Sequence, residues 1–366
     1  MKKIFQIEPS LDEDEKNEIL EVMDSGWYTE AKKTREFEEK FREFTGAKYA
    51  IAVTSGTTAL YLGLKALGIK KGDEVIVPDF TFVASPNSIE MTGAKPIFVD
   101  IDKKTLNLDL QNVEKLITSR TKAIMPVDFN GRKINIQKLR EIAKKNNLHI
   151  VEDACHAIGS FYKNKHAGTL SDVAAFSFSI PKIITTGQGG MIITNKKEIY
   201  QNCVSLKDFG REIGMKKNVL KSFEHNTIGY NFKFTEFQAA VGLAQMRKLS
   251  KRMRQKKSMF KKYFELLSKI KEIEFIETDL KNETPWMIDV LVKEKRKKFI
   301  EYLNEKQIQT RIFYPPIHRL TPYLKSDKKF PITTDISDKG LWLPSAVTLT
   351  ESDQNYVCKE VRKFFN

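Results

Sequence analysis

The chain has 366 residues, of which 41% are hydrophobic and 30% are charged, a composition typical of a folded globular protein rather than a disordered or fibrous one. Its 62 Lys and Arg against 47 Asp and Glu give a formal net charge of +15, which is compatible with a nucleic acid, a membrane surface or an anionic substrate as partner, although the lysines are spread over the whole chain. The length favours two domains, no apolar run approaches the ~20 residues of a membrane span, and Met1–Glu8 lacks the apolar core of a signal peptide.

Two helices are expected before the first strand, over Asp14–Met23 and Thr34–Phe44, because each amphipathic stretch ends near a glycine. From residue 48 to about 195, short runs rich in β-branched residues then alternate with helical patterns. The expected strands are Tyr49–Val53, Glu74–Pro78, Pro96–Asp100, Ala123–Val127, His149–Glu152, Val173–Phe178 and Met191–Thr194. The expected helices between them include Thr57–Leu67, Leu110–Ile117 and Ile136–Asn146. This alternation predicts an α/β fold, with a mostly parallel mixed sheet sandwiched by helices and ligands bound beyond the carboxyl ends of the strands.

One long helix is expected next, over about Thr235–Leu267, with an apolar stripe to bury and an otherwise basic surface. A smaller C-terminal α+β domain should follow it, with elements at Trp286–Val292, Arg296–Glu305 and Glu351–Phe365. We therefore divide the chain into a large domain, residues 1–245, and a small domain, residues 246–366. The basic helix leaves a nucleic-acid-binding protein as an alternative, but no aromatic residues are interleaved with its charges for base stacking.

Three short segments lie where this architecture places a ligand site. Thr54–Thr58 could bind a phosphate through free backbone N–H groups at a helix start, or could serve only as a helix cap. Glu152–His156 ends a buried strand, where a carboxylate is costly unless a cation or a protonated heterocycle pairs with it. Asp153 could instead cap a helix, and His156 could be an ordinary buried imidazole. Lys182, between a proline and a glycine-rich turn, is either a desolvated lysine able to bind an aldehyde covalently or a surface lysine in a turn.

Together, an anion cradle, a carboxylate and a special lysine are the groups that pyridoxal phosphate requires for its phosphate, ring nitrogen and aldehyde. A metal site is not expected, because the five histidines lack the spacing of ligands. Cys155, Cys203 and Cys358 are too few and too scattered for a disulfide framework, so a reducing cytoplasm is the expected compartment.

The chain resembles the DegT/DnrJ/EryC1/StrS sugar aminotransferases, a family of fold-type I pyridoxal-phosphate enzymes, and within it the perosamine-synthase-like branch. The likeness runs from about Pro9 to past Gln238 and resumes more weakly towards the C-terminus. The residues that carry it are Ser55-Gly56-Thr57, Gly72-Asp73-Glu74-Val75-Ile76-Val77-Pro78, Thr81-Phe82, Glu152-Asp153-Ala154, Phe176-Ser177-Phe178, Lys182, Thr185-Thr186-Gly187, Gly229-Tyr230-Asn231, Thr310-Arg311, Tyr314-Pro315, His318 and Leu343-Pro344.

The resemblance implies a role for each matched residue. Lys182 would bind the cofactor covalently and move the proton during transfer, and Asp153 would pair with the ring nitrogen. Phe82 would stack on the ring, and His156, where the family often has Gln, would lie beside the ring hydroxyl. The phosphate would be bound by Gly56, Thr57, Thr58 and Ser177. Candidates for the substrate pocket are Arg311, Tyr314 and His318, which could equally be packing residues of the small domain.

The implied reaction transfers an amino group from L-glutamate to a nucleotide-linked keto sugar, at C4 of a 4-keto-6-deoxyhexose in the perosamine-type case, and releases 2-oxoglutarate. Asn231 would reach the phosphate of a neighbouring subunit, so a homodimer with shared sites is implied. Alternatives on the same scaffold are C3 amination, a UDP- or dTDP-linked sugar, and a sugar dehydratase, which Lys182 disfavours because dehydratases of the family carry His there. Gln188 and Lys233 stand where Glu and Arg are usual, so the exact substrate stays open.

Overall fold

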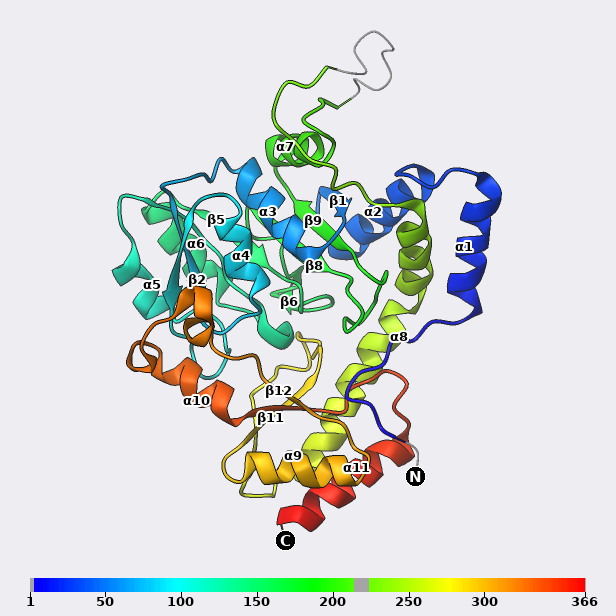
Figure 1. The fold of residues 1–366 in the computed structure, drawn as a ribbon, viewed down its shortest axis with the longest axis vertical. Helices are drawn as coiled ribbons and strands as arrows, with labels where there is room; N and C mark the ends of the chain where they lie inside the picture. The colour runs from blue at the N-terminus through cyan, green and yellow to red at the C-terminus, as the bar shows by residue number, and fades with distance from the viewer. Residues whose placement is uncertain (1–2, 214–223, 366) are drawn as a thin grey trace.

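The computed structural model describes residues 3–213 and 224–365, which form a large sheet and a smaller one joined by one long helix, together with a two-stranded hairpin (Figure 1). The larger sheet has the strand order β1-β9-β8-β5-β4-β2-β3. Its strands are β1 (Tyr49–Val53), β2 (Glu74–Pro78), β3 (Lys95–Val99), β4 (Thr121–Ile124), β5 (His149–Asp153), β8 (Val173–Ser177) and β9 (Gly190–Thr194). Strand β9 runs antiparallel to its neighbours β1 and β8, whereas the other neighbouring pairs are parallel. The predicted α/β fold with a mostly parallel mixed sheet is therefore confirmed.

Helices cover both faces of this sheet. One face is covered by α3 (Gly56–Ala66), α4 (Ala84–Glu90) and α7 (Lys197–Lys207), and the other by α2 (Lys32–Thr45), α5 (Leu110–Leu116), α6 (Ile136–Lys145) and the first half of α8 (Glu236–Leu267). Strand β8 shows why its sequence is continuously apolar. Val173 and Ala175 pack in the cluster under α3, whereas Ala174 and Phe176 pack in the cluster under α2.

Most predicted elements are present, with ends that differ by one or a few residues. Strand β4 ends at Ile124 rather than Val127, because Pro126 has no N–H to donate to the ladder. Val127 instead forms an isolated bridge with Asp153. The hairpin of β6 (Phe161–Tyr162) and β7 (Lys165–His166) was not predicted, because two residues per strand are too few to show a period.

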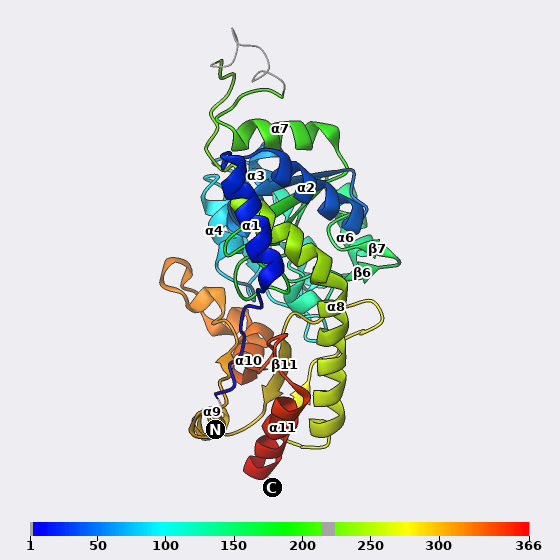
Figure 2. The ribbon, with the colours of Figure 1, turned by 90° about the vertical axis from the view of Figure 1, so that its right-hand side faces the viewer.

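The small sheet is antiparallel, in the order β10-β11-β13-β12. Its strands are β10 (Ile273–Phe275), β11 (Ile288–Val292), β12 (Arg311–Ile312) and β13 (Gly340–Leu343). The helical segments around it are α9 (Arg296–Glu305), η4 (Ile317–Arg319), η5 (Thr321–Tyr323), η6 (Asp327–Lys329), α10 (Pro331–Lys339) and α11 (Glu351–Phe365). The N-terminal segment also joins this region, because Ile4 bridges Ile308 and the Ser345 N–H donates to the Gln6 carbonyl. Both termini consequently lie at the small-sheet end of the molecule (Figure 2).

Helix α8 has 32 residues and extends from the large sheet to the small one (Figure 2). Because it is continuous through residue 245, the proposed domain boundary at this residue stays a prediction. Three of its nine basic residues are paired with acidic neighbours. Lys248 pairs with Asp12 at 2.5 Å and with Glu15 at 2.8 Å, both at the start of α1 (Glu13–Ser25). Further pairs join Arg247 to Glu18 and Lys262 to Glu351.

Among the described residues, no helix combines the length and the apolar character needed to cross a bilayer.

Candidate functional site

A cavity of about 280 Å³ opens where several strands of the large sheet end. The carboxyl ends of β1, β2, β5 and β8 and the amino end of the antiparallel β9 all meet at this edge. The structure brings together here most of the residues predicted from the sequence. They are Gly56, Thr57, Phe82, Asp153, His156, Ser177, Lys182, Arg311 and Tyr314.

The first turn of α3 forms one wall of the cavity. The Ser55 side chain caps this helix by accepting the Thr58 N–H at 3.1 Å. The N–H groups of Gly56 and Thr57 have no acceptor within the helix, so they are available to an anion. A Cβ on Gly56 would lie only 2.9 Å from the Cβ of Ser177, so this wall needs glycine. Thr58 itself does not line the cavity, because its hydroxyl contacts Ser55 Oγ at 2.9 Å.

Asp153 ends strand β5 and presents a buried carboxylate to the cavity, with 6% of the residue exposed. One oxygen accepts the Ser85 hydroxyl at 2.7 Å and the other accepts the Cys155 N–H at 3.2 Å. No Lys or Arg of the described ranges forms an ion pair with it. Since a buried anion is costly without a counter-charge, a protonated heterocycle in the cavity would complete this site.

Lys182 lies in the turn after β8, with its amine in the same cavity. Burial lowers the pKa of Lys182 to about 8; nearby Cys155 and Asp153 partly offset this effect, and Arg311 adds to it. More of this amine is therefore unprotonated near neutral pH than of an exposed lysine. Such an amine can act as a nucleophile towards an aldehyde and can both accept and donate a proton.

His156 lines the same cavity as Lys182, and its burial favours the neutral imidazole. Its ring stacks on Trp286 at 3.9 Å between centroids, and its Nδ1 accepts the Asn130 N–H at 3.4 Å. Burial lowers the pKa of His156 well below its usual value, and the nearby Lys182 charge lowers it further. The imidazole can thus donate a hydrogen bond through Nε2 without adding charge to the site.

The mouth of the cavity combines aromatic rings with one cation. Phe82 is 48% exposed, and its ring centroid lies 5.2 Å from that of Tyr314. The Arg311 guanidinium lies over the Tyr314 ring at 6.0 Å and over the Trp342 ring at 5.9 Å. A flat ring with an anionic substituent suits this entrance.

Besides Thr58, two further predicted site residues, His318 and Asn231, do not line the cavity. His318 is fully buried between two carboxylates, with Nδ1 2.5 Å from Asp79 and Nε2 2.8 Å from Asp327. Burial raises the pKa of Asp79, and the interaction with His318 opposes this rise. Asn231 is exposed and forms an isolated bridge with Asp208. His318 therefore joins the segment after β12 to the end of β2, and Asn231 does not line the cavity of its own chain.

Two contributors were missed by the sequence reasoning. Ser85, the hydroxyl partner of Asp153, comes one helical turn after Phe82, so its place near a strand end was a usable signal. Trp286 has no local signal, because it precedes β11 of the small sheet and is more than a hundred residues from Lys182 in the chain.

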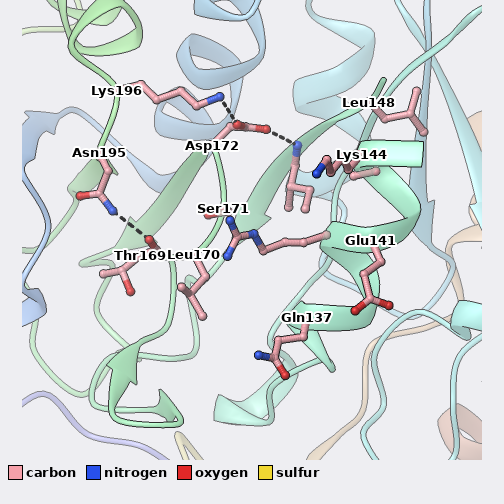
Figure 3. A pocket seen from close by; sticks show the side chains of 13 residues that line it. Gln137, Glu141, Lys144, Leu148, Thr169, Leu170, Ser171, Asp172, Asn195 and Lys196 are labelled. Atoms are coloured by element: carbon pink, nitrogen blue, oxygen red, sulfur yellow. Dashed lines mark hydrogen bonds and ion pairs between the residues drawn. The ribbon is translucent and has the colours of Figure 1, made fainter. Parts of the chain in front are cut away.

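A second, larger cavity of about 700 Å³ lies at the opposite edge of the sheet, near the amino ends of β5 and β8 (Figure 3). Several polar residues that line this cavity are bonded to one another. Asp172 pairs with Lys196 at 2.5 Å, and the Asn195 amide donates to the Thr169 carbonyl at 2.8 Å. None of the candidate residues lines this cavity, so we place the functional site in the smaller one.

Known proteins resemble the chain over nearly its whole length. The family model described as the DegT/DnrJ/EryC1/StrS aminotransferase family matches residues 9–362. The chain belongs to this family. It is therefore an aminotransferase, as the sequence predicted.

Named relatives agree with this assignment. A GDP-perosamine synthase of Escherichia coli O157:H7 is 37% identical over 369 residues, with 100% of each chain covered. A dTDP-3-amino-3,6-dideoxy-alpha-D-galactopyranose transaminase of Aneurinibacillus thermoaerophilus is 34% identical, with 94% of this chain and 93% of the relative covered. The crystal structure of DesV from S. venezuelae superposes with a TM-score of 0.91 at 31% identity and covers 97% of this chain and 95% of that one.

Proposed function

We propose that the protein transfers the amino group of L-glutamate to C4 of a GDP-linked 4-keto-6-deoxyhexose, using pyridoxal phosphate, and yields a GDP-perosamine-type amino sugar and 2-oxoglutarate. One observation carries the proposal: the α3 N-terminus, the Asp153 carboxylate without a cation, and the Lys182 amine converge on one cavity. These groups match the phosphate, ring nitrogen and aldehyde of pyridoxal phosphate. The full-length likeness to a GDP-perosamine synthase supports the sugar substrate.

The residues present fit the cofactor chemically. Gly56 has no side chain, and a Cβ there would collide with Ser177. The free backbone N–H groups at this wall are therefore accessible to a phosphate. When bound, pyridoxal phosphate supplies an electron sink for the carbanion that forms beside the transferred nitrogen. Asp153 would keep a proton on the ring nitrogen, with Ser85 orienting the carboxylate. Lys182 would carry the proton between the carbon that loses it and the carbon that gains it.

The assembly we propose is a homodimer with shared sites in the cytoplasm. Asn231 would contact the phosphate held by the neighbouring subunit. Its exposed position, away from the cavity of its own chain, supports this arrangement. Arg311 at the cavity mouth would attract the anionic parts of glutamate or of the nucleotide sugar.

The test is a turnover screen of the cofactor-loaded protein with L-glutamate and GDP-, dTDP- and UDP-linked 4-keto-6-deoxyhexoses. We expect the GDP sugar to give an amino sugar, identified by mass, with nitrogen at C4 shown by NMR. Lys182→Ala should lose the visible absorbance of the bound cofactor and at least about a hundredfold in rate. Release of ammonia and water without an amino sugar would instead identify a dehydratase, and no product from any sugar would contradict the proposal.

A second candidate is C3 amination of a dTDP-linked sugar. The observation that favours it is the likeness to the transaminase of Aneurinibacillus thermoaerophilus, whose name specifies such a product. The same screen separates the two reactions, because NMR distinguishes an amino group at C3 from one at C4.

A further inference from the structure

Trp286 contacts Lys182 in two ways. Its indole N–H donates to the carbonyl of Pro181, the residue before the lysine, at 2.6 Å. Its ring lies beneath the lysine amine, with 4.1 Å between Nζ and the ring centroid. The residue is only 1% exposed, so neither contact is made in competition with bulk water. Backbone and side chain of the lysine are therefore held by one aromatic residue.

Trp286 is itself fixed on both sides. Before it, the Thr284 N–H donates to Ser160 Oγ at 3.1 Å and the Thr284 hydroxyl donates to the Gly159 carbonyl at 2.7 Å. After it, the Met287 N–H donates to the Asn130 side chain at 2.6 Å, and the same side chain donates back to the Met287 carbonyl at 2.9 Å. The segment that leads into β11 is thus bonded, at the position of the indole, to two connections that follow strands of the large sheet.

The Trp286 ring faces the Lys182 amine at 4.1 Å. The other titratable groups around the amine are Asp153, Cys155, His156 and Arg311. His156 lies against Trp286 as well, but it is neutral, so no second cation competes for the ring. A desolvated ammonium over an indole face is stabilised more than one in water, and this contact opposes the cost of burial.

We propose that Trp286 is the positioning residue for Lys182: its N–H fixes the backbone before the lysine, and its ring holds the free amine at the cavity wall. The catalytic part of this inference rests on the proposed function, whereas the contact between indole and lysine does not. The indole ring stabilises the protonated form of the Lys182 amine, and the indole N–H fixes the backbone position from which the lysine side chain extends.

Two substitutions separate these contributions. Trp286→Phe keeps an aromatic face but removes the N–H, and Trp286→Leu removes both. Trp342→Phe is the matched control, because Trp342 is equally buried, its ring lies 5.8 Å from that of Trp286, and its Nε1 has no hydrogen-bond partner in the described part of the chain.

The first readout uses the protein without cofactor. Acetylation of Lys182 by acetic anhydride, followed by peptide mass spectrometry from pH 6 to 10, reports the pKa of its amine. We expect Trp286→Leu to lower this pKa by about one further unit, Trp286→Phe to change it by only a few tenths, and Trp342→Phe to leave it unchanged. A wild-type titration in Trp286→Leu would overturn the inference.

The second readout is turnover of the loaded enzyme. We expect Trp286→Phe and Trp286→Leu to lower kcat by about tenfold to a hundredfold with little change in KM for the sugar, because the lysine is displaced rather than the substrate. If kcat fell only as much as the fraction of unfolded protein rose, and Lys182 titrated normally, Trp286 would have a merely structural role. That result would contradict the inference. A shifted titration in a protein that aminates no sugar would uphold the contact and refute the proposed function instead.

Discussion

The cavity contains an amine and a carboxylate that do not neutralise each other, and the ionisation of each has a measurable consequence. Because burial lowers the pKa of Lys182 to about 8, its basic form increases as pH rises through that value. We therefore expect kcat to rise with pH, about tenfold per unit on the acid side, and to level off above about 8. The measurement is kcat between pH 6 and 9.5 at saturating substrates. A profile that is flat from pH 6 to 8 would rule out the lysine as the base.

Asp153 should act through its charge rather than through its hydrogen bonds. Asp153→Asn retains an oxygen for the Ser85 hydroxyl but removes the charge, so we expect kcat to fall about a hundredfold or more while the cofactor remains bound. The matched control is Ser85→Ala, which removes the hydrogen bond and leaves the charge, and should cost about tenfold. Steady-state rates, with cofactor content measured by absorbance, check both. Equal losses in the two variants would show that orientation, not charge, is what matters.

Among the helices, α8 carries an unusual buried cation. Lys256 is 1% exposed, and its amine donates to the Ser345 carbonyl. Burial, with a smaller effect of Arg252, lowers the pKa of Lys256 to about 7. The unfolded chain, with an ordinary lysine pKa, therefore binds more protons between about pH 7 and 10.5, and the free energy of unfolding should rise with pH across this window.

Replacing this lysine should remove that dependence. We expect Lys256→Met to stabilise the protein, and to do so by about 2 kcal/mol more at pH 6.5 than at pH 9, because the variant lacks the buried charge. Urea unfolding at the two pH values measures the difference. Lys251→Met, an exposed lysine on the same helix, serves as control and should show no such change. Destabilisation of the Lys256 variant at both pH values would mean that its hydrogen bond outweighs the charge.

The elements also show what could be predicted from the sequence. Strands buried on both faces, and a helix start marked by a cap such as Thr350, are local properties, so β1, β2 and α11 agree with their predicted bounds. Residues just after strands, such as Asp153, were found for the same reason. Trp286 was not found, because its contact with Lys182 arises from the packing of the small sheet against the large one. Nor does the sequence reveal that His318 faces Asp79, 239 residues away, rather than the cavity.

For the whole molecule, the shared sites that we propose predict complementation between defective subunits. In a mixed dimer of Lys182→Ala and Asn231→Ala chains, one site would carry both defects and the other would carry neither. We expect each pure variant to be weakly active at limiting cofactor, and an equal mixture, after subunit exchange, to recover about a quarter of wild-type activity by random pairing. Steady-state rates before and after exchange test this. The absence of recovery, with dimers confirmed by sedimentation, would place Asn231 outside the neighbouring site.

The net charge of +15 also belongs to the whole molecule, and we expect it to affect substrate capture only weakly. On α8, Arg247, Lys248 and Lys262 are paired with acidic residues at α1 and α11, so the positive charge of this helix is partly neutralised. We expect KM for the nucleotide sugar to rise no more than about threefold between 0.05 and 0.3 M salt. A steep rise would indicate a concentrated positive field near the cavity.

The position of the two chain ends beside the small sheet has a practical consequence. Figure 2 shows both ends at the small-sheet end of the molecule, whereas the walls of the candidate cavity come mainly from the strand ends of the large sheet, so we expect a tag on the C-terminus to leave the cavity accessible. The two ends differ as attachment sites for a fusion. Ile4 and Gln6 are bonded into the fold, so an N-terminal fusion should begin before them, whereas helix α11 leads outwards and can be extended directly. Immobilised through its C-terminus, the enzyme would keep its cavity open to substrates in a flow reactor.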